Sequence, residues 1–130
     1  MTPLQLQETI LLGEGPSVEF KRCGNQPRSD TFETICSFSN RNGGSIYLGV
    51  TDSGDIVGVP QASLLSIKRN IVNVTNNENV FSPTVVTEFE EIQVEDNTVL
   101  RVWVPMSSSI HRYKKAVFDR AEDADIRVET

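Results

Sequence analysis

Residues 35–59 read ICSFSNRNGGSIYLGVTDSGDIVGV, and this stretch joins the end of a helix to a glycine turn and two short strands. Apolar side chains spaced three and four apart just before and within its start predict the helix. Asp30 is expected to be its N-cap, with Glu33 as the capping-box partner. Asn42-Gly43-Gly44 tolerates positive φ angles, so the helix should end there.

The rest of this stretch predicts a hairpin. Apolar and other side chains alternate over residues 46–51, which indicates a strand. Residues 52–55 (Asp-Ser-Gly-Asp) have the composition of a turn, and residues 56–59 should return as a short strand.

Together with the upstream run from Glu14 to Lys21 (EGPSVEFK), this stretch resembles the Schlafen AlbA-like family, formerly called divergent AAA. The family pattern has a Glu-Phe-Lys strand, then a helix ending in Asn-x-x-Gly-Gly, then Gly-Val-x-Asp-x-Gly-x-Ile-x-Gly. The chain departs from it at Gly15, where serine is common. The resemblance implies a DNA-binding domain of a bacterial transcriptional regulator, with residues 1–130 as the N-terminal module of a longer protein. A cytoplasmic location is expected because the sequence has no signal-peptide pattern and its two cysteines are interpreted as reduced thiols.

Composition fits one domain of 130 residues. No apolar run approaches the roughly 18 residues that a membrane span requires. The formal net charge of −6 opposes general binding to a phosphate backbone. However, residues 101–120 contain five basic residues and one acidic residue, whereas residues 83–97 contain five acidic residues and no basic one. This distribution allows a local basic face, although these charges could equally be solvated strand faces.

The remaining pattern predicts an α+β fold with a mixed, largely antiparallel sheet and two or three packed helices. The first helix should start at Thr2-Pro3, with Leu4, Leu11 and Leu12 as its apolar side. A further helix should follow Pro60. A long strand over residues 83–95 is expected to bulge near Glu90-Glu91 and to turn into a strand over residues 99–104. Two last strands, near residues 116–120 and 126–129, should close the sheet.

Acidic side chains flank the first strand. Glu19 and Lys21 share one strand face because they are two residues apart, and this face should point away from the core. If the first strand lies beside the strand over residues 46–51, Asp52 approaches the same cleft. Glu14, Glu19 and Asp52 could then hold Mg²⁺ or Mn²⁺, with Lys21 offsetting charge on a cleaved phosphate. The resemblance implies that the same three acids would be catalytic in a metal-dependent ribonuclease. The alternative is a surface ion pair between Glu19 and Lys21.

A second group of side chains suits nucleic acid. Arg112, Lys114 and Lys115 could contact phosphates, and Tyr113 could stack on a base. His111 is interpreted as an exposed loop residue, with a phosphate contact as the functional alternative. The full set of predicted nucleic-acid contacts is Lys21, Arg22, Arg41, His111, Arg112, Tyr113, Lys114 and Lys115.

Other chemistry is not expected. The Gly-x-x-x-x-Gly-Lys-Ser/Thr motif of a P-loop is absent, so no ATP site is predicted. Alternation places Trp103 on the strand face opposite Leu100, Val102 and Val104, and it is expected to pack under a helix there. Cys36 is expected in the core and Cys23 in a loop. Three hypotheses remain: a nucleic-acid-binding module acting on DNA or RNA, a metal-dependent ribonuclease, and a non-catalytic oligomerisation or sensory domain.

Overall fold

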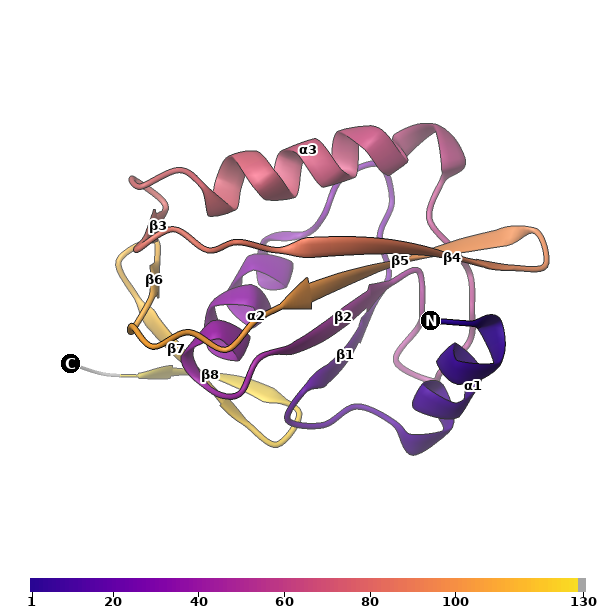
Figure 1. Ribbon diagram of the computed structural model, residues 1–130, viewed down its shortest axis with the longest axis horizontal. Helices are drawn as coiled ribbons and strands as arrows, with labels where there is room; N and C mark the ends of the chain where they lie inside the picture. The colour runs from indigo at the N-terminus through magenta and orange to yellow at the C-terminus, as the bar shows by residue number, and fades with distance from the viewer. Residues whose placement is uncertain (129–130) are drawn as a thin grey trace.

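The centre of the protein is a four-stranded sheet in the order β1-β2-β5-β4 (Figure 1). The computed structural model describes residues 1–128. In this sheet β1 (Val18–Lys21) runs parallel to β2 (Gly44–Leu48). The other two strands, β4 (Glu88–Val94) and β5 (Asn97–Val104), complete it with antiparallel pairing. The predicted mixed, largely antiparallel sheet is confirmed.

Three helices pack around this sheet. On one face, α2 (Ser29–Asn40) and α3 (Leu64–Thr75), the latter preceded by the 3₁₀ turn η1 (Gln61–Ser63), enclose the larger core. The helix α1 (Pro3–Leu12) lies away from them, at the lower right of Figure 1, beside a smaller core. That core consists of Leu6, Phe20, Tyr47, Val50, Ile92 and Val99. The α+β class is therefore confirmed, with a core on each face of the sheet. Within residues 1–128, every helix is too short or too polar to cross a membrane.

The four remaining strands form two small sheets rather than extending the central one. The short strands β3 (Phe81–Ser82) and β6 (Arg112–Tyr113) pair with each other. The strands β7 (Val117–Ala121) and β8 (Ala124–Val128) form a separate hairpin, and β7 packs along α2. The expectation that the last strands close the central sheet is therefore wrong. Residue 129, at the end of the predicted last strand, lies outside the described residues.

The bulge expected near Glu90-Glu91 is not present, because β4 and β5 pair residue by residue from Glu88–Trp103 to Val94–Asn97. The change in apolar parity along β4 has another cause. Phe89 packs against the larger core, whereas Ile92 belongs to the smaller core on the opposite face. A regular strand that contributes to both cores produces the sequence pattern that suggested a bulge.

The helix starts show one confirmed cap and one error. Thr2 caps α1 through its hydroxyl, which accepts from the Gln5 backbone N–H at 3.1 Å, and Pro3 occupies the first turn. However, α2 has Arg28 at its N-cap position, without a side-chain cap bond. Asp30 lies within its first turn and forms an ion pair with Lys21 instead. A carboxylate in the first turn still interacts favourably with the helix dipole.

Two other expectations, on the apolar side of α1 and on the hairpin after β2, are also corrected. The predicted apolar side of α1 is exposed, since Leu4, Leu11 and Leu12 face solvent and the helix buries Leu6. Beyond β2, which ends at Leu48, the predicted hairpin is reduced to a single bridge between Val50 and Ile56.

Candidate functional site: an acidic cleft and a basic turn

The four residues proposed for catalysis line one cleft. This cleft has a volume of about 340 Å³ and lies beside β1 and the start of α2. Its walls are formed by Glu14, Glu19, Phe20, Lys21, Arg22, Arg28, Asp30, Asp52 and Asp123. The structure thus brings Glu14, Glu19, Lys21 and Asp52 together, although Asp52 is 33 positions beyond Glu19 in the chain.

Glu19 is the buried carboxylate of this cleft, with 8% of its surface exposed. It shares a face of β1 with Lys21, as predicted, but that face is turned toward α2 rather than away from the core. Lys21 Nζ lies 3.5 Å from Glu19 Oε1, and Arg120 Nη2 lies 3.6 Å from Glu19 Oε2. Among the described residues, Glu19 Oε2 has no hydrogen-bond partner. A buried carboxylate oxygen without a hydrogen bond is costly, so Glu19 depends on these two cations.

Arg120 is the residue that sequence reasoning missed. Its side chain is fully buried, and it donates from Nη1 to Asp125 Oδ1 at 2.8 Å and from Nη2 to the Gly15 carbonyl at 2.9 Å. Its guanidinium lies 4.8 Å from the centre of the Phe38 ring. Asp125 in turn accepts from the hydroxyl groups of Thr34 and Ser37. A cation that was expected on a basic face therefore holds the β7–β8 hairpin against β1 and α2.

Glu14 lies at the rim of the same cleft. Partial burial raises the pKa of its carboxyl group above the usual value, partly opposed by the Phe20 backbone N–H, which donates to Glu14 Oε2 at 3.1 Å. The nearby charge of Asp52 adds to the increase in pKa. Across residues 1–128, no three His, Cys, Asp or Glu side chains are grouped closely enough to hold a metal ion. The carboxylates have the right chemistry for Mg²⁺, but Glu19 is already engaged by Lys21 and Arg120.

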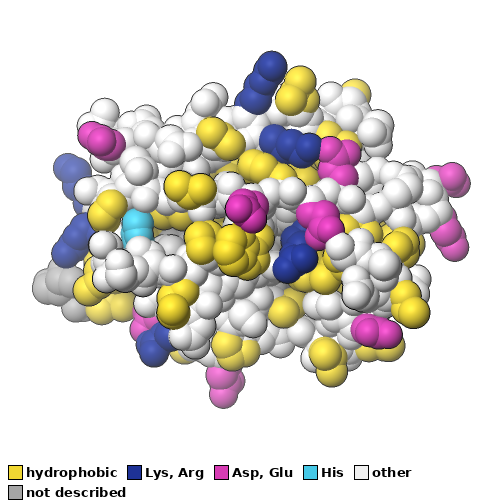
Figure 2. Space-filling view, viewed as in Figure 1, with side chains coloured by type: hydrophobic (Ala, Val, Ile, Leu, Met, Phe, Trp, Pro, Cys, Tyr) yellow, Lys and Arg dark blue, Asp and Glu magenta, His cyan; other side chains and the backbone are white. Residues whose placement is uncertain are grey.

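The exposed basic residues gather at the turn between β6 and β7. Tyr113 and Ala116 exchange two backbone hydrogen bonds, of 2.8 and 3.0 Å, which close a two-residue turn around Lys114 and Lys115. Both lysines have left-handed backbones, with φ of 48° and 70°. Arg112 is exposed just before the turn. We call Arg112, Lys114 and Lys115 the basic turn. Lys and Arg side chains lie at the left-hand end of Figure 2, which carries β6 and β7 in Figure 1, and acidic side chains are visible at both ends.

Two members of the predicted nucleic-acid set are buried instead. His111 is 5% exposed; its Nδ1 lies 2.7 Å from the Pro83 carbonyl and its Nε2 2.7 Å from Ser107 Oγ. Because a carbonyl only accepts, this geometry fits a proton on Nδ1. The interpretation of His111 as an exposed loop residue is wrong, since it joins the loop before β6 to the strand region around Pro83. Its two ring nitrogens have partners, so His111 has no contact to offer a phosphate.

Tyr113 also faces inward, with 5% of its surface exposed. Its ring centre lies 6.0 Å from that of Phe32, in a stacked arrangement, and 5.1 Å from that of Phe81. A ring packed in this way does not stack on a nucleobase, which corrects its predicted role. Of the other predicted contacts, Lys21 and Arg22 line the acidic cleft, and Arg41 donates two hydrogen bonds to the carboxylate of Asp119.

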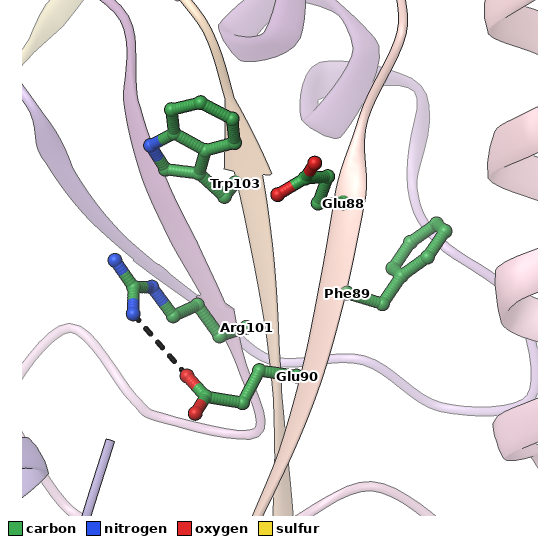
Figure 3. A pocket seen from close by; sticks show the side chains of 5 residues that line it. All are labelled: Glu88, Phe89, Glu90, Arg101 and Trp103. Atoms are coloured by element: carbon green, nitrogen blue, oxygen red, sulfur yellow. Dashed lines mark hydrogen bonds and ion pairs between the residues drawn. The ribbon is translucent and has the colours of Figure 1, made fainter.

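A second surface site surrounds Trp103 (Figure 3). Alternation along β5 puts Trp103 on the sheet face opposite Leu100, Val102 and Val104, which belong to the larger core. The expectation that Trp103 packs under a helix is wrong, because 38% of it is exposed. The Trp103 pocket has a volume of about 390 Å³ and is lined by Glu88, Phe89, Glu90, Arg101 and Trp103. Alternation along β5 correctly predicted that Trp103 faces away from the larger core. The sequence could not reveal that this part of the sheet has no helix over it.

The sequence motif over residues 14–21 and the fold around it have counterparts among known proteins. The Schlafen, AlbA_2 family profile matches residues 14–129, which is most of the chain. The chain belongs to the Schlafen AlbA_2 family. No match was found among the curated proteins.

Two solved structures share the fold of this family member. One is the N-terminal domain of a RecG-related protein from Nitrosomonas europaea, with 24% identity and a TM-score of 0.58; the match covers 82% of this chain and 74% of that one. The other is the DIP2311 protein from Corynebacterium diphtheriae, with 16% identity and a TM-score of 0.66. That match covers 96% of this chain but 29% of the other, so the shared domain is one part of a longer protein there.

Proposed function

We propose that this Schlafen AlbA_2 domain is a nucleic-acid-binding module and that the basic turn is its contact with the phosphate backbone. The observation that carries the proposal is the backbone of Lys114 and Lys115. Residues other than glycine, asparagine and aspartate seldom adopt positive φ, and two-residue turns of this kind favour Asn-Gly. Lysine at both positions reduces the stability of the turn, and a charge displayed to a partner would account for it.

The surroundings of the basic turn support this proposal. All three of its side chains are exposed, and within the described residues none of them takes part in an ion pair. Arg41, by contrast, is paired with Asp119, and Arg120 is buried. With a net charge of −6 on the chain, the contact should be local and of low affinity, and it should depend strongly on salt.

The comparisons also support a role in nucleic-acid binding, without indicating which nucleic acid. The Nitrosomonas europaea protein is described as related to a putative ATP-dependent DNA helicase, and its N-terminal domain has the present fold. For this chain we propose the role of a binding module within a bacterial transcriptional regulator. In the host cell, the full-length regulator should then be recovered with discrete DNA segments, and the turn variant described next should lose them.

The double variant Lys114→Asn/Lys115→Gly tests the contact without harming the fold, because Asn-Gly is the sequence that this turn prefers. Mobility shifts with duplex DNA and with RNA should show weaker binding at every salt concentration. The slope of log affinity against log salt should fall in magnitude by about 2, since each lost phosphate contact removes roughly 0.9.

The charge control is Lys68→Gln/Arg69→Gln, which removes the same charge from α3, where Lys68 is paired with Glu91. Its affinity should stay close to that of the wild type. If the control loses as much affinity as the turn variant, the effect is one of net charge, and the basic turn is not the contact.

A metal-dependent ribonuclease is a second candidate, favoured by the cleft that collects Glu14, Glu19 and Asp52 beside Lys21. A hard divalent cation bound there would polarise a phosphate oxygen or activate a water molecule. Binding would require Glu19 to exchange its contacts with Lys21 and Arg120 for the cation. Glu19→Gln should then abolish Mn²⁺-dependent cleavage of labelled tRNA while binding persists or tightens, because one repelling charge has gone. Intact tRNA in the presence of Mn²⁺ with wild-type protein would exclude this candidate.

A further inference from the structure

The side chains of the Trp103 pocket lie in two neighbouring cross-strand rows, on a part of the sheet that no helix covers. In the pairing of β2, β5 and β4, Ser45, Trp103 and Glu88 form one row across the three strands. The adjacent row on the same face holds Arg101 and Glu90. Directly opposed side chains on a sheet have Cβ atoms about 5 Å apart, so the Glu88 carboxylate lies beside the Trp103 indole. Figure 3 shows the two projecting to the same side of the strands.

The pocket has unused hydrogen-bonding capacity of both kinds. Within residues 1–128, the Glu88 carboxylate has no hydrogen bond and no ion pair. Arg101 donates from Nε to Ser45 Oγ at 2.9 Å and from Nη1 to Glu90 Oε1 at 3.2 Å, which leaves Nη2 available. The pocket therefore presents an aromatic face, a pair of acceptor oxygens and a donor.

We propose that this pocket binds an unpaired guanine base, stacked on Trp103 and held by Glu88. Guanine carries two adjacent donors, N1–H and the N2 amino group, which match the two oxygens of one carboxylate. Its O6 acceptor is on the same edge, where Arg101 Nη2 could donate. Adenine, cytosine and uracil each lack this pair of adjacent donors. Stacking supplies affinity that does not depend on the base, so Glu88 supplies the selectivity.

The charges of the pocket favour a flat neutral ligand over an ion. Glu90 is engaged by both Arg101 and the N-terminal ammonium group of Met1. The two carboxylates, Glu88 and Glu90, are thus balanced by a guanidinium and an ammonium group. The pocket as a whole therefore carries no net charge, and neither a simple cation nor a simple anion would interact favourably with all of its groups. A base that both donates and accepts satisfies Glu88 and Arg101.

This inference rests on the proposed function, because an exposed base occurs in a single-stranded nucleic acid. The strand β5 runs toward the end of the molecule that carries β6 (Figure 1), so Trp103, near the end of β5, lies in the half of the sheet that is nearer the basic turn. A strand held at the basic turn could then place one unpaired base on Trp103.

The test uses the fluorescence of Trp103, which is the only tryptophan in the chain. The probes are guanosine and inosine monophosphate, which share the phosphate and the purine ring but differ in the N2 amino group. Saturable quenching should be tighter with the guanosine probe by about 5-fold or more, as expected for a lost carboxylate contact. Glu88→Gln should remove this preference, whereas Glu78→Gln, an exposed carboxylate elsewhere, should leave it unchanged.

Four results would overturn the inference: equal binding of the two probes, quenching that does not saturate, a preference unaffected by Glu88→Gln, or displacement of the guanosine probe by N-acetylarginine amide. The last would identify a basic peptide as the ligand. The double variant at Lys114 and Lys115 separates the two proposals, because a mononucleotide does not need the basic turn. Loss of polynucleotide binding by that variant, with the guanosine preference intact, supports both proposals. If wild-type protein binds polynucleotides but shows no preference for guanosine, this inference alone is wrong. If it prefers guanosine but binds no polynucleotide, the proposed function alone is wrong.

Discussion

Arg120 and Glu19 meet inside the protein with Nη2 and Oε2 3.6 Å apart, although about a hundred positions separate them in the chain. This contact joins the β7–β8 hairpin to the first strand, next to the acidic cleft that Glu19 lines. The guanidinium of Arg120 also binds Asp125 and the carbonyl oxygen of Gly15. One buried cation therefore compensates two acidic side chains and ties three segments together.

Replacing Arg120 with alanine should destabilise the protein by about 3–5 kcal/mol, because the buried Glu19 and the partly buried Asp125 would both lose the cation that compensates them. Urea unfolding followed by circular dichroism measures this loss. Arg127→Ala, on the exposed part of β8, is the control and should cost well under 1 kcal/mol. An Arg120→Ala variant as stable as the control would show that the buried network does not hold the hairpin in place.

Gly43 should not tolerate a side chain. Its φ is 77°, and a Cβ atom there would lie 2.7 Å from the Val104 carbonyl oxygen and 2.8 Å from the Met106 backbone nitrogen. Gly43→Ala should therefore cost more than about 1 kcal/mol in unfolding free energy, from strain and from displaced backbone. Gly24→Ala is the matched control, since nothing lies within 4 Å of a Cβ atom at that position. Equal stability of the two variants in a thermal melt would refute this role for Gly43.

Local patterns predicted the parts of the fold that local chemistry determines. The glycine pair at residues 43–44 marks the end of α2, and Thr2 caps α1. Alternation along β5 places Trp103 and Val102 on opposite faces of the sheet. The resemblance carried by residues 14–21 and 35–59 led to the correct family, and the acidic residues that it singled out share one cleft.

The errors arise where a partner distant in the sequence decides the outcome. Glu19 was expected to face away from the core, but the β7–β8 hairpin brings Arg120 over it. His111 looked exposed in a serine-rich loop, yet Pro83 and Ser107 bind its two ring nitrogens. Trp103 stays exposed because no helix extends over its end of the sheet. Periodicity reports which side of a strand is apolar, but it does not report what covers that side.

The two cysteines should be unreactive in the folded protein. Burial raises the pKa of both Cys23 and Cys36 to about 11, so at pH 8 only about one thiol in a thousand is ionised. Alkylation by iodoacetamide should be at least ~100-fold slower than in urea-unfolded chains, as measured by mass spectrometry. The variants Cys23→Ser and Cys36→Ser assign the rate to each thiol. Rapid labelling of Cys36 in native conditions would contradict its place in the core.

Stability should depend on pH through Glu14. Its pKa is raised in the folded state, mainly by burial, so the folded protein holds the proton more tightly than the unfolded chain does. Stability should therefore fall as the pH rises from the unfolded pKa through the higher folded one, and stay reduced above it. Glu14→Gln removes this penalty and can still accept the Phe20 N–H bond, so the variant should be more stable than wild type at pH 7. The advantage should disappear well below pH 4.5, the usual pKa of the group, in urea unfolding at several pH values. Glu78→Gln, on an exposed loop, provides the background, and an advantage of Glu14→Gln that is independent of pH would disprove the assignment.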